Sequence, residues 1–121
     1  MITSTKTTGN RGELAVAKKL HHDGFTILHQ NYQIRQGEID IIAQKDDLII
    51  FVEVKTRKHQ YFPLSQVITP SKQRKIINTA KWFIAQNKIV SALLRFDVAL
   101  VTESKTPIIN YIANAFQGAL F

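Results

Sequence analysis

The sequence contains no cysteine. This absence excludes disulfides, zinc sites built on thiolates and thiol nucleophiles, so any metal ligand must be an oxygen atom or an imidazole nitrogen. No apolar run approaches the length of a membrane span, and the first residues lack the apolar core of a signal peptide. We therefore expect a cytoplasmic protein with no membrane partner.

Acidic residues are few, with nine Asp and Glu against sixteen Lys and Arg and a formal net charge of +7. Several of these acids lie inside apolar runs, so the exposed surface must be more basic still. Such a surface attracts polyanions, of which nucleic acid is the commonest. A charge that only keeps the protein soluble is the alternative.

Glycine and proline are also scarce, at five and three residues, and the composition is that of an ordinary globular protein. The 121 residues fit one domain spanning 1–121, in which only residues 1–9 are expected to be flexible.

Hydrophobic patterning and turn residues predict the order helix, three strands, helix, two strands. The first helix is expected to be capped at Asn10, with Glu13 at the third position, and to end at His22. Thr69 and Pro70 predict the start of the second helix, which should end near Asn87. The remaining predicted elements are strands at 25–34, 37–43, 51–55, 95–101 and 108–112, an irregular basic connection at 56–68, and a short helix in the last nine residues. This order indicates an α/β or α+β fold with a mixed central sheet.

Three carboxylates and a lysine interrupt two of these apolar runs, GEIDIIA at 37–43 and FVEVK at 51–55. If Asp46 and Asp47 form a two-residue hairpin turn, Asp40 falls opposite Glu53 and Glu38 falls opposite Lys55. All four side chains then project from one face of the sheet. The other face would be filled by Ile39, Ile41, Val52 and Val54.

Two ionised carboxylates opposed at about 5 Å repel each other, so something must relieve the repulsion. The candidates are protonation of one acid, the neighbouring Lys55, or a bound Mg²⁺ or Mn²⁺. In the purely structural alternative, Glu38 and Lys55 form a cross-strand ion pair and Asp40 bonds to the backbone. Glu13 is either a helix cap or a further acid of the same site.

A metal held by Asp40 and Glu53, with a lysine two residues beyond, suits phosphodiester hydrolysis. The basic surface would hold the substrate. Candidate phosphate contacts are Arg11, Arg35, Arg57, Lys58, Lys72 and Lys75. Asp97, which alternates with Arg95 on one face of its strand, either lies near the site or forms an ion pair, and we favour the structural role. We interpret Trp82, beside Phe83, as a packing residue.

Asp40 is followed about a dozen residues later by a Glu-X-Lys triplet at 53–55. This pattern resembles the PD-(D/E)XK nuclease superfamily, in the variant without the leading proline. A longer match resembles the bacterial YraN family. It consists of GNRGE at 9–13, NY at 31–32, GEIDIIA at 37–43, FVEVKTR at 51–57, Lys72, RFDV at 95–98 and NAF at 114–116. The segment after Arg57 departs from this family's pattern because it lacks the usual glycine.

This resemblance implies a restriction-endonuclease-like mixed sheet of about five strands flanked by helices, similar to archaeal Holliday junction resolvases. It implies that Asp40, Glu53, Glu13 and the Val54 carbonyl hold Mg²⁺ or Mn²⁺, with Lys55 as the active-site lysine. The expected function is metal-dependent cleavage of nucleic acid, DNA rather than RNA and branched DNA in particular, by a protein that the resolvases suggest is a homodimer. A non-catalytic nucleic-acid-binding or scaffolding protein with the same fold is the alternative.

Overall fold

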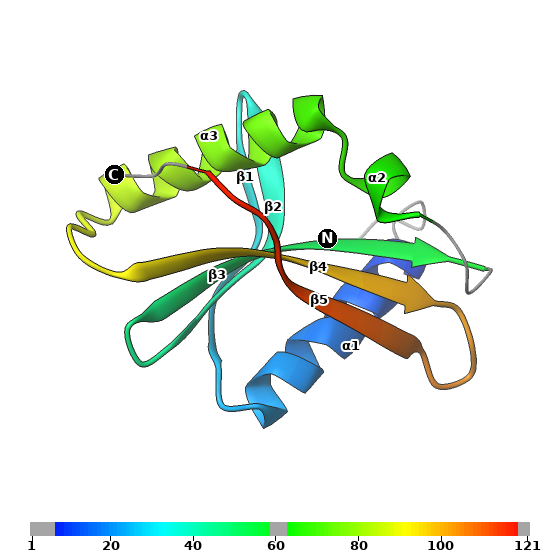
Figure 1. Cartoon of the computed structure of the whole chain (residues 1–121). Helices are drawn as coiled ribbons and strands as arrows, with labels where there is room; N and C mark the ends of the chain where they lie inside the picture. The colour runs from blue at the N-terminus through cyan, green and yellow to red at the C-terminus, as the bar shows by residue number, and fades with distance from the viewer. Residues whose placement is uncertain (1–6, 59–62, 119–121) are drawn as a thin grey trace.

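The computed structural model describes residues 7–58 and 63–118. Its elements are α1 (Thr7–His22), β1 (Thr26–Ile34), β2 (Gly37–Lys45), β3 (Leu48–Arg57), α2 (Leu64–Val67), α3 (Pro70–Gln86), β4 (Leu93–Thr102) and β5 (Ile108–Phe116). Figure 1 shows a twisted sheet with α1 on one face and α3 on the other. The mixed sheet flanked by helices is therefore confirmed, and the architecture is consistent with a restriction-endonuclease-like fold.

The five strands lie in the order β1-β2-β3-β4-β5 across the sheet. Neighbouring strands are antiparallel except for β3 and β4, which are parallel. A parallel pair cannot be joined by a tight turn, and here the connection runs through α2 and α3. Because β3 and β4 are covered on both faces, their sequences are almost continuously apolar.

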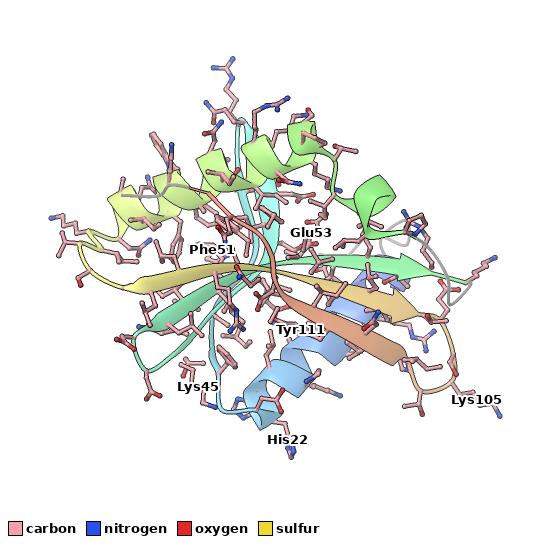
Figure 2. All side chains as sticks on the ribbon, in the orientation of Figure 1. His22, Lys45, Phe51, Glu53, Lys105 and Tyr111 are labelled. Atoms are coloured by element: carbon pink, nitrogen blue, oxygen red, sulfur yellow. The ribbon has the colours of Figure 1, made fainter. Side chains whose placement is uncertain are left out.

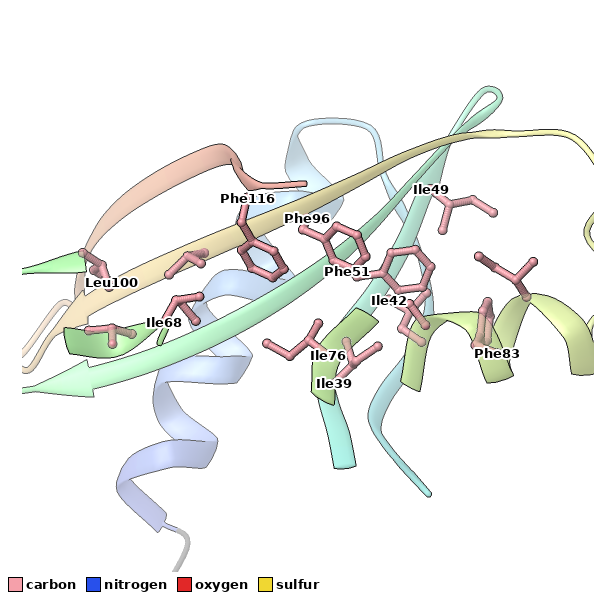
Figure 3. Packing of buried hydrophobic residues seen from close by; sticks show 14 residues of the cluster. Ile39, Ile42, Ile49, Phe51, Ile68, Ile76, Phe83, Phe96, Leu100 and Phe116 are labelled. Carbon is pink, nitrogen blue, oxygen red and sulfur yellow. The ribbon is translucent and has the colours of Figure 1, made fainter. Parts of the chain in front are cut away.

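Buried side chains form a layer on each face of the sheet. On the α3 face, the ring centroids of Phe96 and Phe116 lie 4.9 Å apart and those of Phe51 and Phe96 lie 5.5 Å apart (Figure 3). On the α1 face, Val16 packs with the small and β-branched residues of the central strands. Figure 2 shows the same division, with Phe51 on the α3 side and Tyr111 on the α1 side.

The second predicted helix is confirmed as α3. Its Thr69 side chain accepts a hydrogen bond from the Lys72 N–H at 3.2 Å, Pro70 occupies the first turn, and Asn87 follows the last residue. The apolar stripe faces the sheet, with Ile76 and Phe83 buried. No helix within the described residues is long and apolar enough to span a membrane.

Two predicted boundaries are wrong. Helix α1 begins at Thr7, so Asn10 lies within the helix and is not its cap, and residues 7–9 are helical while residues 1–6 lie outside the described part of the chain. The chain after Ile112 is not a helix, because β5 continues to Phe116. The connection predicted to be irregular at 56–68 also differs from the structure. Its first two residues, Thr56 and Arg57, belong to β3, and it contains the short helix α2, while residues 59–62 lie outside the described part.

The predicted assignment of side chains to faces is wrong at one residue of β2. Ile39 packs in the layer on the α3 face, whereas Ile41, Val52 and Val54 pack in the layer on the α1 face. Strict alternation would put Ile39 and Ile41 on the same side, so β2 changes phase at Asp40. The backbone of β1 is distorted at the same level, because Asn31, between the partners of Ile39 and Ile41, has a left-handed φ of 53°.

Candidate active site

A pocket of about 350 Å³ opens between α1, α3 and the ends of β2 and β3. It is lined by Glu13, Gly37, Glu38, Asp40, Glu53, Val54, Lys55, Lys72, Lys75 and Ile76. Four elements thus bring together the four acids and the lysine that the sequence analysis singled out, together with two further lysines.

The pocket forms where β2 separates from β3. The predicted hairpin register is confirmed from Lys45 opposite Leu48 to Ile41 opposite Val52. The ladder ends there, so the predicted pairs Asp40–Glu53 and Glu38–Lys55 do not form as strand pairs. At Asp40, the residue of β2 next to Ile41, the side chain instead of the main chain contacts β3. Its Oδ2 accepts a hydrogen bond from the Val54 N–H at 2.7 Å. The phase change at Asp40 therefore turns its carboxylate toward the neighbouring strand and fixes it at the rim of the pocket.

Asp40 and Glu53 form a buried pair of carboxyl groups, with 8% and 7% of their surfaces exposed. Burial, followed by the charge of Glu53, raises the pKa of Asp40 to about 8, although the Val54 N–H works in the opposite direction. Glu13 raises this pKa further by its charge. At neutral pH and without a metal, Asp40 therefore retains a proton.

Two lysines neutralise Glu53. Lys72 Nζ lies 2.8 Å from Glu53 Oε2, and Lys55 Nζ lies 3.9 Å from the same oxygen. A hydrogen bond with Lys72, together with burial, lowers the pKa of Lys55. Burial also opposes the charge on Lys72, but its hydrogen bonds with Glu53 and Lys55 raise its pKa overall.

The contact between Lys72 and Glu53 was not predicted. Sequence analysis treated Lys72 only as a phosphate contact, because nothing local connects residues 53 and 72. Lys72 does stand one helical turn before the buried Ile76, and this was the available signal that its side chain points toward the sheet.

The purely structural alternative is confirmed in one part and wrong in the other. Asp40 does bond to the backbone, at the Val54 N–H, but Glu38 and Lys55 form no ion pair among the described residues. In residues 7–58 and 63–118, the ion pair of Lys55 is with Glu53, and Glu38 is an exposed residue at the pocket wall. Glu13 lies well inside α1 rather than in its first turn, so it is not a cap, and it too lines the pocket.

The other candidate phosphate contacts are more dispersed. Lys75 lines the pocket beside Lys72. Arg35 is exposed in the turn between β1 and β2, and Arg57 and Lys58 are exposed at the end of β3. Arg11 is exposed on α1, where its Nη2 donates to the Ser104 carbonyl at 3.4 Å, outside the pocket.

Gly37 allows the hairpin of β1 and β2 to lie directly against α3. A Cβ at this position would stand 2.9 Å from the Thr79 hydroxyl oxygen and 3.5 Å from the Lys75 carbonyl. This close approach places the acids of β2 beneath the lysines of α3.

Asp97 lies elsewhere and has a structural role, as the sequence suggested. It is fully buried, accepts two hydrogen bonds from Arg95 at 2.8 and 2.9 Å, and also accepts from the Tyr111 hydroxyl and the Asn114 N–H. These bonds join β4 to β5 on the α1 side of the sheet.

The donor atoms of the pocket suit a small divalent cation with few protein ligands. In the described part of the chain, no three His, Cys, Asp or Glu side chains stand close enough together to enclose an ion. Asp40 and Glu53 do form a pair of buried carboxyl groups, and Val54, which lines the same pocket, carries a carbonyl oxygen. Mg²⁺ commonly binds one or two carboxylates and keeps several waters, so this donor set fits it.

Comparison with known proteins identifies the family. The family described as "Uncharacterised protein family UPF0102" matches residues 12–101. The chain belongs to the UPF0102 family. This is the YraN family that the motifs resembled, and the matched residues contain Glu13, Asp40, Glu53 and Lys55.

Relatives in UPF0102 match nearly the whole chain. A UPF0102 protein of Caldicellulosiruptor saccharolyticus is 40% identical over 112 residues, covering 89% of this chain and 95% of that protein. A UPF0102 protein of Geotalea daltonii is 41% identical, covering 94% and 92%. One from Vibrio parahaemolyticus is 39% identical, covering 96% and 97%. These names state the family and no activity.

Proposed function

We propose that this UPF0102 protein is a metal-dependent nuclease that hydrolyses phosphodiester bonds in nucleic acid, with DNA preferred to RNA. The observation that carries the proposal is the pocket, in which the buried pair Asp40 and Glu53 lies beside Lys55. The net charge of +7 supports a polyanionic substrate. The preference for branched DNA rests on the resemblance to Holliday junction resolvases.

In this proposal Asp40, Glu53 and the Val54 carbonyl hold Mg²⁺ or Mn²⁺, and Glu13 supplies a third acid at the pocket wall. The ion supplies Lewis-acid polarisation of the phosphate and a bound water of lowered pKa. Lys55 orients the attacking water and stabilises negative charge on the phosphate, because its ammonium lies beside Glu53. Lys72 and Lys75 lie at the same pocket and hold the phosphate groups.

A specific observation favours the alternative of nucleic-acid binding without catalysis. Lys72 Nζ already neutralises Glu53 at 2.8 Å, and the described side chains contain no group of three metal ligands. For catalysis, Lys72 must exchange its contact with Glu53 for one with substrate phosphate. A binding or scaffolding protein needs no such exchange.

Cleavage assays separate these functions. Wild-type protein is incubated with Mg²⁺ or Mn²⁺ and labelled four-way junction, linear duplex, single-stranded DNA and RNA, beside Asp40→Ala, Lys55→Ala and the pocket-wall control Glu38→Gln. We expect cleavage by the wild type and Glu38→Gln, with a loss of at least about a hundredfold in the other two variants. Equal cleavage by all four proteins would indicate a contaminant and overturn the nuclease proposal, whereas metal-independent binding without cleavage would support the alternative.

A further inference from the structure

Trp82 on α3 is more exposed than its sequence context suggests. The interpretation of this residue as packing fits its neighbour Phe83, which is 6% exposed, but Trp82 itself is 52% exposed. In the described part of the chain, Phe83 makes edge contacts with Tyr32 and Phe51, and no aromatic ring contacts Trp82. About half of the Trp82 surface, 52%, is therefore open to solvent.

The position of Trp82 relates it to the pocket. Lys75, Asn78 and Trp82 are spaced i, i+3 and i+7 along α3, so they occupy one stripe of the helix surface. All three are exposed, and Lys75 lines the pocket. Seven residues of helix rise about 10 Å, which is about three phosphate spacings of a stacked strand.

The surroundings of Trp82 are polar and basic rather than apolar. On the helix its exposed neighbours are Asn78, Lys81, Ala85 and Gln86, of which only the small Ala85 is apolar. The core of a protein interface requires a contiguous apolar patch, which these neighbours do not provide. A single exposed aromatic ring among cationic and amide side chains is typical of a platform on which a nucleobase stacks.

We propose that Trp82 stacks on an unpaired nucleobase of the strand whose phosphates contact Lys75 and Lys72. This inference rests on the proposed function only in requiring a nucleic-acid ligand, and it adds that the ligand has an unpaired segment next to the pocket. It extends the binding surface from the pocket along the exposed stripe of α3 that carries Lys75, Asn78 and Trp82.

Trp82 is the single tryptophan of the chain, so its fluorescence reports directly on this contact. Wild-type protein without divalent metal is titrated with oligothymidylate and with a blunt duplex of matched length, while labelled DNA reports binding by anisotropy. We expect oligothymidylate to quench Trp82 fluorescence in proportion to binding, and the duplex to quench it much less.

Variants test the contribution of stacking. Trp82→Ala should weaken binding of oligothymidylate by about five- to hundredfold, with a smaller effect on the duplex, and Trp82→Phe should restore most of the affinity. Lys75→Ala should weaken the binding of both ligands to a similar extent, because a phosphate contact does not distinguish paired from unpaired bases. Circular dichroism checks that each variant is folded.

Binding seen by anisotropy with unchanged Trp82 fluorescence would overturn the stacking inference and leave the proposed function standing. Failure of the wild type to bind either ligand would overturn both. A spectral shift that depends on protein concentration alone, without DNA, would assign the exposed face to a second copy of the chain and also overturn the inference.

Discussion

Asp40 is buried and also lies close to another acid, Glu53. Both conditions disfavour the ionised form of its carboxyl group. Its raised pKa of about 8 means that the folded protein binds this proton more tightly than the unfolded chain, in which the ordinary value is 3.8. The free energy of unfolding should therefore fall as the pH rises from about 4 to about 8, and this contribution is fully present only below about pH 4. At neutral pH the buried Asp40 therefore lowers the free energy of unfolding.

The Asp40→Asn variant tests how much the ionisable carboxyl group lowers the free energy of unfolding. The amide oxygen can still accept the Val54 N–H, but the side chain no longer ionises beside Glu53. We expect Asp40→Asn to be more stable than the wild type by roughly 1–3 kcal/mol at pH 8, with the difference disappearing near pH 4. Urea denaturation across this pH range measures it, with Glu38→Gln as the exposed control. A constant difference at all pH values would mean that Asp40 does not titrate as described.

Lys72 and Lys75 stand close together in sequence on α3 but differ in their contacts. Lys72 pairs with the buried Glu53, whereas Lys75 is exposed at the pocket wall. Lys72→Met should lower the free energy of unfolding by about 1–3 kcal/mol because it leaves a buried carboxylate with only the more distant Lys55. Lys75→Met should change it by less than about 0.5 kcal/mol. Equal effects in urea denaturation would show that the ion pair of Lys72 contributes little.

At the scale of elements, β4 and β5 depend on a single buried acid. Asp97 accepts hydrogen bonds from Arg95 and Tyr111 and from the backbone of Asn114, whose left-handed φ of 54° marks an irregularity in β5. This network lies on the opposite side of the sheet from α3 and outside the pocket.

Asp97→Ala should therefore destabilise the fold strongly, by about 3–5 kcal/mol, because it leaves a partly buried guanidinium without its partner. Tyr111→Phe should cost less, about 1–2 kcal/mol, since it removes one hydrogen bond. Thermal unfolding compares the two variants. A loss of less than 1 kcal/mol in Asp97→Ala would contradict the role of this network.

The elements that sequence reasoning predicted correctly are those with local signals. The two-residue turn at Asp46 and Asp47 fixed the register of β2 and β3, and Thr69 with Pro70 fixed the start of α3. The predicted end of β5 was wrong because the backbone of Asn114 is held by Asp97, seventeen residues earlier in the sequence. Strand propensity alone cannot predict such a long-range contact.

The candidate site shows the same contrast. Spacing along the hairpin was enough to predict that Asp40 and Glu53 lie close together, because the predicted register of β2 and β3 holds as far as the neighbouring pair, Ile41 and Val52. It could not show that β2 changes phase at Asp40 or that Lys72 crosses from α3 to Glu53, because each depends on contacts between elements. The prediction that Trp82 packs with its neighbour Phe83 is wrong, because adjacent residues of a helix point in different directions and Trp82 points away from the core.

For the whole molecule, the excess of basic residues predicts how binding responds to salt. If the ligand is nucleic acid, the logarithm of the observed association constant should fall linearly with the logarithm of the salt concentration. The slope should be roughly −3 to −5 for four to six phosphate contacts. Lys75→Ala should reduce the magnitude of this slope by about one. Anisotropy titrations with labelled DNA at several salt concentrations measure it, and a slope near zero would argue against a phosphate-binding surface.

The central claim is that Asp40 and Glu53 form a divalent metal site, and calorimetric titration with Mn²⁺ tests it most directly. At pH 7 the ion must displace the proton that Asp40 retains, so the heat of binding should depend on the ionisation enthalpy of the buffer in the wild type. Asp40→Asn should lose this proton release and most of the affinity. Absence of Mn²⁺ binding by the wild type, or equal binding by Asp40→Asn, would contradict the claim.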